Sequence, residues 1–237
     1  MEKGKFVISL DFELVWGVFD HITLTDKVAY FDNTLEVIPK MLACFEKHQL
    51  HVTWATVGML FNQNWEEWLG NKPVEIPTYT NTKLDAYVYG LQHQHLGLDR
   101  FFFAPELIKL IQKTPGQELA THTYSHYYCL ESGQTKTQFE QDLDKAVIMA
   151  SNFGATLHSL VFPRNQWNPD YLVSCQERGI TQLRSNPDAW YWKDTSQSTL
   201  ATKLFRTGDA YLPLGSTSYS MENVKIDLVT AQPASRF

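Results

Sequence analysis

The sequence predicts an α/β protein built around a mainly parallel sheet. Three observations lead to this class: short apolar runs alternate with segments of helical period, most of those runs end in charged or polar residues, and 237 residues are enough for one large domain. In barrels and open sheets of this class, the residues that follow the strands carry the chemistry. The segments after each expected strand are therefore the first candidates for a functional site.

The first half of the chain opens as strand, helix, strand. Residues 6–10 form a short apolar run that ends in charge, and residues 52–57 are β-branched and aromatic and precede Gly58. A long excursion is expected at about residues 59–115, and its part 62–82 is rich in Trp, Pro, Asn and Thr without a clear period. Long segments of this kind often carry function. Between the two strands, residues 33–48 place apolar side chains at helical spacing: Leu35, Ile38, Met41, Leu42 and Phe45.

The second half continues the alternation. Helices are expected at 105–112, at 137–153 and at about 169–178. Strands are expected at 118–122, 159–162 and near 180–184, with one more at 203–206. The remaining tail contains Ser, Thr, Asn and Gln and is expected to lack a closing strand. We therefore expect five or six β/α units in a single domain that spans residues 1–237.

Composition argues against several partners and sites. The net charge is −6 without a basic run, so nucleic acid and anionic lipid surfaces would be repelled. No stretch approaches the roughly 18 apolar residues of a membrane span. The N-terminus enters a strand-like run without a signal-peptide pattern, which predicts a cytoplasmic protein. Cys44, Cys129 and Cys175 are far apart and odd in number, so we expect three core residues and neither a disulfide nor a thiolate zinc site.

Two acids stand two residues apart at the end of the first expected strand. In the run SLDFE, the period of a strand points Asp11 and Glu13 the same way, so that one carboxylate could bind a cation while the other acts as a base. The alternative is a solvated strand end that carries two unrelated acids.

Two histidines follow a later strand with four-residue spacing. In THTYSHY, a helical turn would place His122 and His126 on one side, as in helical zinc pairs. The alternative is a surface histidine and a core histidine whose spacing is chance. Glu13 could supply a third ligand, because neighbouring parallel strands end at the same edge. Two imidazoles and one carboxylate leave open metal positions, as metal-assisted hydrolysis requires.

Two further segments follow strands and carry polar or aromatic residues. Arg164 in FPRN could hold Asp11 ionised through charge-assisted hydrogen bonds, and the alternative is a surface salt bridge. In the run SNPDAWYW, polar side chains could orient substrate and a tryptophan could form a pocket wall. The alternative for this run is a polar turn followed by aromatic packing. The residues concerned are Asn186, Asp188, Trp190 and Trp192.

These motifs, in this order, resemble those of the NodB-like polysaccharide deacetylases, carbohydrate esterase family 4. The resemblance covers about residues 5–206. The family's first motif carries a base Asp and a ligand Asp, which Asp11 and Glu13 resemble, with Glu for the second Asp and one residue between them. The second motif, HTxxH, is matched by His122 and His126, and the third begins with an Arg, matched by Arg164. The residues within these motifs resemble those of the branch of the family that acts in cell-surface polysaccharide and O-antigen biosynthesis.

The resemblance implies a distorted (β/α) barrel of the seven-stranded deacetylase type, which could be incomplete at its C-terminus. It implies a hydrolase that removes an N-acetyl or O-acetyl group from a sugar of a cell-surface polysaccharide or its precursor. The implied cofactor is a divalent metal, with zinc preferred. The implied partner is an acetylated aminosugar or polysaccharide precursor.

The resemblance also implies residue roles. Asp11 would take a proton from the attacking water, and the backbone N–H of Trp167 would help to form an oxyanion hole, although Gln166 and Asn168 replace the Pro and Gly common beside it. The metal ligands would be Glu13, His122 and His126. The residues expected to bind substrate are Trp16, Asn165, Asn186 and Trp190.

One departure concerns the proton donor. The family's last motif, a Leu and a His after the final strand, supplies the general acid, whereas this sequence has no histidine after His158. Three readings stay open: the domain is truncated, a residue from elsewhere such as His93 or His95 acts as the acid, or the protein is an inactive sugar-binding remnant. A deformylase, or an amidase acting on a small cyclic amide, is a further alternative, because the same scaffold hosts these activities.

Overall fold

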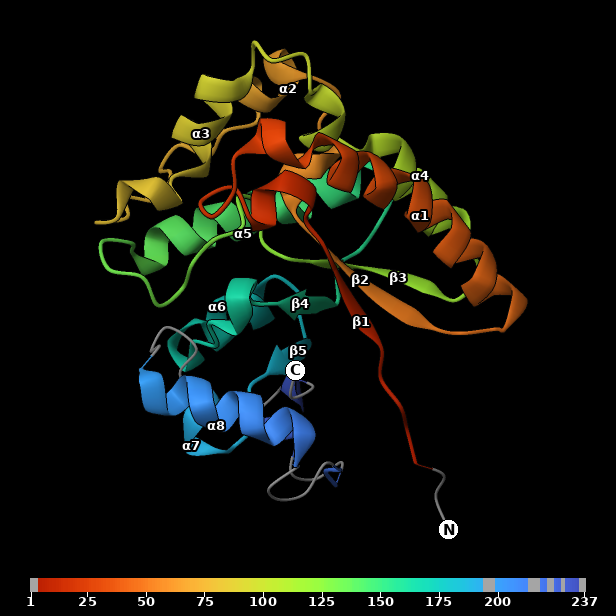
Figure 1. Ribbon diagram of the computed structural model, residues 1–237, viewed down its shortest axis with the longest axis vertical. Coiled ribbons are helices and arrows are strands. Elements are labelled where there is room, and N and C mark those ends of the chain that lie inside the picture. The colour runs from red at the N-terminus through yellow and green to blue at the C-terminus, as the bar shows by residue number, and fades with distance from the viewer. Residues whose placement is uncertain (1–3, 194–198, 213–217, 221–223, 227–228, 235–237) are drawn as a thin grey trace.

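Seven strands form one curled sheet in the computed structural model, which describes residues 4–193, 199–212, 218–220, 224–226 and 229–234 (Figure 1). The strand order is β1-β2-β3-β4-β5-β7-β6, and every neighbouring pair is parallel except β7 and β6. The partial barrel confirms the predicted class. The strands are β1 (Ser9–Phe12), β2 (Val52–Thr56), β3 (Gln117–Thr121), β4 (Ser159–Val161), β5 (Gln182–Ser185), β6 (Lys225–Ile226) and β7 (Val229–Pro233).

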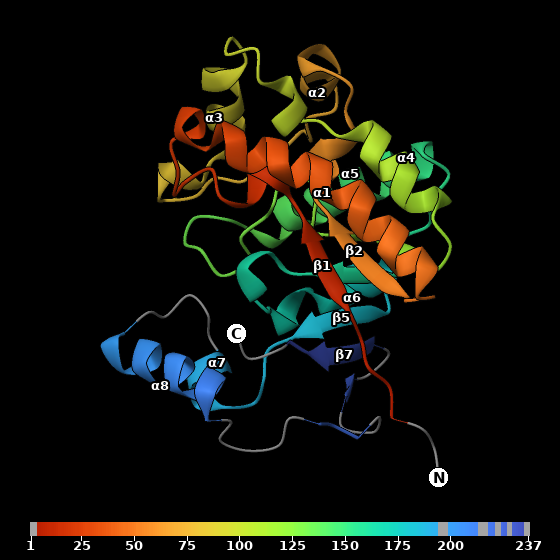
Figure 2. The ribbon, with the colours of Figure 1, turned by 45° about the vertical axis from the view of Figure 1, so that its right-hand side comes forward.

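Helices surround the sheet. In Figures 1 and 2, α1 and α4 lie side by side near β1 to β3, and α7 with α8 lies at the end of the molecule opposite α2 and α3. The α-helices are α1 (Val28–Lys47), α2 (Trp65–Gly70), α3 (Ala86–His93), α4 (Pro105–Lys113), α5 (Lys136–Asn152), α6 (Leu172–Glu177), α7 (Trp190–Lys193) and α8 (Leu200–Tyr211). Short 3₁₀ helices occur at Leu14–Gly17, Leu24–Lys27, Gly58–Phe61, Thr82–Leu84, Asp99–Phe101, Pro163–Asn165 and Pro169–Tyr171.

The sequence explains why α5 forms where it does. Thr135 and Gln138 make a reciprocal capping box: the Thr135 side chain accepts from the Gln138 backbone N–H, and the Gln138 side chain accepts from that of Thr135. Residues at helical spacing then bury one face of the helix, namely Phe139, Leu143, Ala146, Met149 and Ala150. The first turn of α5 is therefore held in place, and so is the end of the segment that precedes the helix.

Several boundaries differ from those expected. Strand β1 extends to Phe12 rather than to residue 10, and α1 begins at Val28 rather than near residue 33. The excursion contains two short helices, α2 and α3, which were not expected because the sequence there shows no clear helical period. Helix ends are set by local caps and packing, so pattern alone locates them poorly.

The carboxyl ends of the first strands lie level with one another. Asp11 is paired in register with Ala55, and Ala55 with Ala120. Thr121 in turn pairs with Leu160 of β4. The segments that follow β1, β3 and β4 therefore meet at one edge of the sheet, as expected for parallel strands.

A pair of side chains, the Asp11–Arg184 brace, connects β1 with β5. Arg184 Nη1 and Nη2 donate to the two carboxylate oxygens of Asp11, each at 2.7 Å, and Arg184 Nε donates to Asn165 Oδ1 at 2.9 Å. Strands β2, β3 and β4 separate β1 from β5 in the sheet. The brace therefore links two strands that are not hydrogen-bonded neighbours.

The C-terminal part corrects two predictions. Residues 203–206, expected as a strand, belong to α8, whose first turn is capped by the Thr199 side chain accepting from the Thr202 backbone N–H. The tail, expected to lack a strand, supplies β7, which pairs with β5. Only Val229 and Ala231 are buried in β7. Their alternation with Thr230 and Gln232 is the pattern of a half-buried strand, but the run is short and ends at Pro233.

Two of the three cysteines are core residues, as expected. Cys129 and Cys175 are buried, but Cys44 is exposed on α1, so the core prediction is wrong for Cys44. Its position lies off the helix face that buries Phe31, Ile38 and Leu42. Within the described residues, no helix is long and apolar enough to span a lipid bilayer.

Candidate active site

Glu13, His122 and His126 converge at the edge where β1 and β3 end, and we call them the histidine–glutamate cluster. Glu13 Oε2 lies 3.3 Å from His122 Nε2 and 3.1 Å from His126 Nε2. One ligand atom from each residue lies within 4.8 Å of the other two. Both imidazoles are 1% exposed, whereas the Glu13 side chain is 27% exposed. The cluster therefore opens to solvent on its carboxylate side.

The segment with the two histidines reaches this arrangement without a helix. Thr123 (φ 63°) and His126 (φ 58°) adopt left-handed conformations that residues other than glycine rarely populate. The Thr123 hydroxyl stabilises the turn, because it donates to His122 O and accepts from Tyr127 N–H, each at 2.6 Å. The helical turn considered from the spacing is wrong, and a tight loop turns both rings toward Glu13 instead.

Strained backbone is concentrated in the same region. Among the described residues, six other than glycine have positive φ, and five of them follow β1, β3 or β4. Each such conformation costs roughly 1–3 kcal/mol and persists only where the surrounding structure fixes it. This clustering is typical of a functional site. The five are Leu14, Thr123, His126, Arg164 and Asn165, and the sixth is Gln49.

Asp142 of α5 anchors the segment between the two histidines. Its carboxylate accepts from the backbone N–H of Tyr124 at 2.7 Å and of Ser125 at 3.1 Å, and also from the Ser125 hydroxyl. Burial raises the pKa of Asp142 to about 7, although these hydrogen bonds oppose the rise. From the neighbouring strand end, Gly58 N–H donates to Thr123 O at 2.9 Å. Two separate elements therefore fix the loop.

The ionisation states within the cluster suit metal ligands. Burial lowers the pKa of His126, which favours the neutral imidazole. Burial alone would raise the pKa of Glu13, but the neighbouring imidazoles of His122 and His126 outweigh it and hold that pKa below its ordinary value. An ionised carboxylate and a neutral imidazole are the forms that bind divalent metals.

The contacts of His122 indicate that the cluster fits a cation. His122 Nδ1 lies 2.8 Å from Val161 O, so Nδ1–H donates to that carbonyl and Nε2 carries a lone pair on the side of Glu13. This Nε2 atom is buried and has no hydrogen-bond partner among the described residues. A buried lone pair that faces a carboxylate is unfavourable unless a cation lies between them. Val161 would then fix the tautomer of a ligating histidine.

Arg164 pairs with Asp20 rather than with Asp11. Arg164 Nη2 lies 2.5 Å from Asp20 Oδ1, and its guanidinium carbon lies 4.7 Å from the centre of the Tyr128 ring. The predicted Arg164–Asp11 pairing is wrong, because Arg184 donates to both oxygens of Asp11. Arg164 nonetheless lies close to the cluster, since the Tyr128 ring also packs against His126.

The backbone N–H of Trp167 is engaged within its own loop. It donates to Asn165 O at 2.8 Å, across Gln166, whose dihedral angles (φ −74°, ψ 67°) are those of an inverse γ-turn. A donor held in this turn is not directed at a substrate. The structure therefore does not place the Trp167 N–H as an oxyanion-hole donor, and its ring instead packs edge-on against Phe162.

Trp16 is a core residue, which overturns its predicted role in binding substrate. Its side chain is fully buried, and its Nε1–H donates to Phe102 O at 2.8 Å. The other three predicted residues lie after β4 and β5. Asn186 Nδ2 donates to Asn165 O at 2.9 Å, and Trp190 is 58% exposed. For these three residues, contact with substrate stays a prediction.

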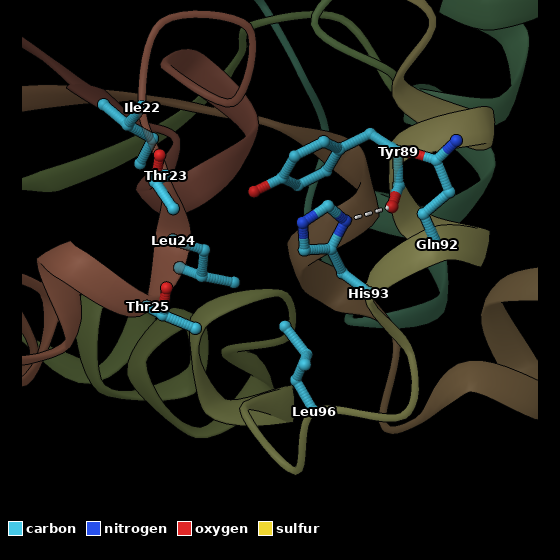
Figure 3. Close-up of a pocket in the computed structure, with 8 residues that line it drawn as sticks. All are labelled: Ile22, Thr23, Leu24, Thr25, Tyr89, Gln92, His93 and Leu96. Carbon is cyan, nitrogen blue, oxygen red and sulfur yellow. Dashed lines mark hydrogen bonds between the residues drawn. The ribbon is translucent and has the colours of Figure 1, made fainter.

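A separate pocket of about 320 Å³ lies beside the segment that follows Asp20, and Figure 3 shows it. The ring of His93 stacks on that of Tyr89 with centres 3.9 Å apart, and His93 Nδ1–H donates to Tyr89 O. The pocket lining includes no residue of the cluster, so His93 faces this pocket rather than the cluster. The lining is Ile22, Thr23, Leu24, Thr25, Tyr89, Gln92, His93 and Leu96.

Three residues around the site were not among those expected from the sequence to have a role. Asp142 shares the buried helix face of Phe139 and Leu143, and an acid on an apolar face is a signal that could have identified it. Asp20 follows directly after the apolar run LVWGVF, and an acid at the end of such a run is a similar signal. Arg184 lies at the end of the strand expected near residues 180–184, a position at which a charged residue indicates a functional site.

Comparison with known proteins agrees with this geometry. A sequence profile described as polysaccharide deacetylase matches residues 21–183. No curated protein matches the sequence. Among solved structures, a protein of Mycobacterium smegmatis described as a polysaccharide deacetylase is 14% identical, with a TM-score of 0.50 and coverage of 77% of this chain and 51% of that chain.

Two further solved structures have lower TM-scores. A de-N-acetylase from Aggregatibacter actinomycetemcomitans is 14% identical (TM-score 0.44; 84% of this chain, 74% of that chain). A family 4 carbohydrate esterase from Streptomyces lividans is 12% identical (TM-score 0.42; 78% of this chain, 63% of that chain). The chain spans about half the length of the Mycobacterium protein, with which the likeness is one of fold. The profile match covers more than half of the sequence and includes His122, His126 and Arg164. This chain therefore belongs to the polysaccharide deacetylase family.

Proposed function

We propose that this protein is a metal-dependent hydrolase that removes an N-acetyl, or an O-acetyl, group from a sugar of a cell-surface polysaccharide or its precursor. The observation that carries the proposal is the Glu13 carboxylate within 3.3 Å of two buried imidazole nitrogens, one of which has no hydrogen-bond partner among the described residues. Family membership supports the reaction class. We also propose a cytoplasmic location, since the expected substrate is a biosynthetic precursor.

The cluster would hold the metal, for which we propose zinc. A divalent ion at such a site acts as a Lewis acid, polarising the acetyl carbonyl and lowering the pKa of a water. Glu13 would present its carboxylate at the solvent-facing side, while the buried imidazoles keep water from the other side. His122 would be held in one tautomer by Val161 O, and the loop of His126 by Asp142. This rigid support is what a hydrolytic site requires of its ligands.

A second candidate function is a sugar-binding protein without hydrolytic activity. One observation favours it: the Trp167 N–H donates within its own turn. This candidate predicts that acetylated saccharides bind, but that no acetate is released even when zinc or cobalt is supplied.

The proposed function is tested by metal analysis combined with acetate release. Purified protein is expected to contain about one equivalent of metal, and His126→Ala much less, because one of three ligands is lost. Acetate release is then measured on a panel of N-acetylated and O-acetylated oligosaccharides with zinc or cobalt added. His48→Ala is the matched control, since His48 is exposed at the end of α1 and has no proposed role. Metal binding without acetate release from any substrate would favour the second candidate, and absence of metal binding would reject the proposed metal-dependent hydrolysis.

A further inference from the structure

Asp11 and Asp20 are each paired with an arginine, but in different ways. Arg184 donates to both oxygens of Asp11. Arg164 contacts Oδ1 of Asp20, whereas Asp20 Oδ2 lies 3.4 Å from His21 Nε2. Asp20 therefore keeps one oxygen outside its arginine pair, and Asp11 does not. An ionised carboxylate with a lone pair that no arginine occupies is the better proton acceptor.

The two carboxylates also differ in exposure. The Asp20 side chain is 5% exposed and the Asp11 side chain 32%. Arg164, which holds Asp20, is 28% exposed. Charged groups act more strongly on a reaction where water is excluded, because fewer solvent dipoles screen them. The Asp20 carboxylate has this environment and the Asp11 carboxylate does not, although Arg184, at 16% exposed, is more buried than Arg164.

Tyr128 connects the Asp20–Arg164 pair with the cluster. Its ring centre lies 5.0 Å from that of His126 and 4.7 Å from the guanidinium carbon of Arg164. Its hydroxyl is buried without a hydrogen-bond partner in the described part of the chain. Tyr128 therefore packs between Arg164, the partner of Asp20, and His126 of the cluster.

We propose that Asp20, held by Arg164, is the proton acceptor of the hydrolysis, and that Asp11 instead braces the sheet. This assignment rests on the proposed function. The water oxygen forms a bond to the acetyl carbon while its proton passes to Asp20 Oδ2. The carbon–nitrogen bond then breaks, and the same proton passes to the leaving nitrogen, which gives acetic acid and a free amine. The acetic acid then loses its own proton to solvent and leaves as acetate. Asp20 would thus serve as both base and acid, so no histidine near the C-terminal end of the sheet is required.

The first test measures binding and needs no sugar substrate. Acetohydroxamic acid binds zinc as its anion and gives its proton to a nearby base, so its affinity reports that base. Isothermal titration of zinc-loaded protein is expected to show affinity at least tenfold weaker in Asp20→Asn than in wild type. Zinc affinity itself is expected to be unchanged, because Asp20 is not a ligand. Asp20→Glu keeps a carboxylate and is expected to recover part of the hydroxamate affinity.

The second test measures kcat for acetate release on the best substrate of the panel. Loss of a general base typically lowers the rate 10²- to 10⁴-fold, so Asp20→Asn is expected to lose at least roughly 10²-fold. The matched control is Asp32→Asn, because Asp32 also pairs with an arginine, Arg100, but on the surface of α1. Its kcat and hydroxamate affinity are expected to equal those of wild type.

The outcomes separate this assignment from the proposed function. Hydroxamate affinity that is the same, or undetectable, in wild type and Asp20→Asn would overturn the assignment whether or not any sugar is hydrolysed. A large loss in Asp11→Asn with none in Asp20→Asn would also overturn it, in favour of Asp11. Weaker hydroxamate binding in Asp20→Asn, without acetate release by wild type, would support the assignment of the base and count against the proposed deacetylation.

Discussion

Gly17 lies against the carboxylate of Glu13. A Cβ atom at position 17 would be 1.9 Å from Glu13 Cδ and 2.1 Å from Glu13 Oε1. The 3₁₀ turn Leu14–Gly17 creates this contact, and Trp16 N–H closes the turn by donating to Glu13 O at 3.0 Å. The absence of a side chain at position 17 therefore lets the carboxylate reach the two histidines.

Gly17→Ala is accordingly expected to weaken zinc binding at least tenfold, a loss of about 1.4 kcal/mol, because the new methyl group would displace Glu13. Competition with a chelator of known zinc affinity measures the change. Gly70→Ala is the control, since a Cβ at Gly70 meets open space at the end of α2, and its zinc affinity should match that of wild type. Equal affinities in all three proteins would contradict the prediction that position 17 controls the placement of the Glu13 carboxylate.

Zinc is expected to raise the melting temperature of the wild type but not of His122→Ala. A ligand that binds only the folded state, at a concentration of 100 times its Kd, stabilises by about 2.7 kcal/mol. For a chain of this size, that corresponds to a rise of roughly 5–10 °C. Thermal unfolding with zinc and with excess chelator measures the rise, and His48→Ala should behave as wild type does. A zinc-dependent rise of the same size in His122→Ala would remove His122 from the ligand set.

Asp142 is expected to make stability depend on pH. Burial raises the pKa of Asp142 from 3.8 to about 7, so between about pH 4 and pH 7 the folded protein binds a proton that the unfolded chain has lost. Its contribution to the free energy of unfolding is therefore full below pH 4 and is lost as the pH rises through about 7, by a few kcal/mol. Asp142→Asn cannot titrate. Its free energy of unfolding, measured by urea titration, should fall less than that of wild type over this window, and parallel profiles would contradict the prediction.

Arg184→Lys is expected to lower the free energy of unfolding by roughly 1–3 kcal/mol, because a lysine cannot reproduce the two parallel hydrogen bonds to Asp11. Arg100→Lys offers a matched comparison, since Arg100 pairs with Asp32 in a similar way but with both side chains more than 40% exposed. That change should cost less than about 0.5 kcal/mol. Equal losses in urea titrations of the two variants would mean that the brace contributes no more than a surface pair.

The sequence alone predicted the strand-and-helix order and the grouping of Glu13, His122 and His126. Both follow from general rules for parallel sheets: the strands end at the same edge, and the polar residues that follow them lie together there. The strand at β7 was missed because only two of its residues are apolar and buried. The helix α8 was mistaken for a strand because residues 203–206 are too few to show helical period, and its cap at Thr199 lies outside that run.

The partners of the arginines could not be predicted in the same way. Arg164 and Arg184 each follow or end a strand, and each could reach an acid at the same edge. The choice between Asp11 and Asp20 depends on the curl of the sheet and on the left-handed backbone at Arg164 and Asn165, neither of which pattern or propensity encodes. The engagement of the Trp167 N–H depends on the same turn.

The Asp11–Arg184 brace has a consequence for how this family member can vary. In addition to the backbone ladder that runs through β2, β3 and β4, two side chains hold the first strand directly opposite the fifth. Changes in loops that contact neither these strands nor the brace are therefore expected to leave Glu13 in place beside the histidines. An engineer could exploit this tolerance by grafting new recognition loops there while leaving the brace intact.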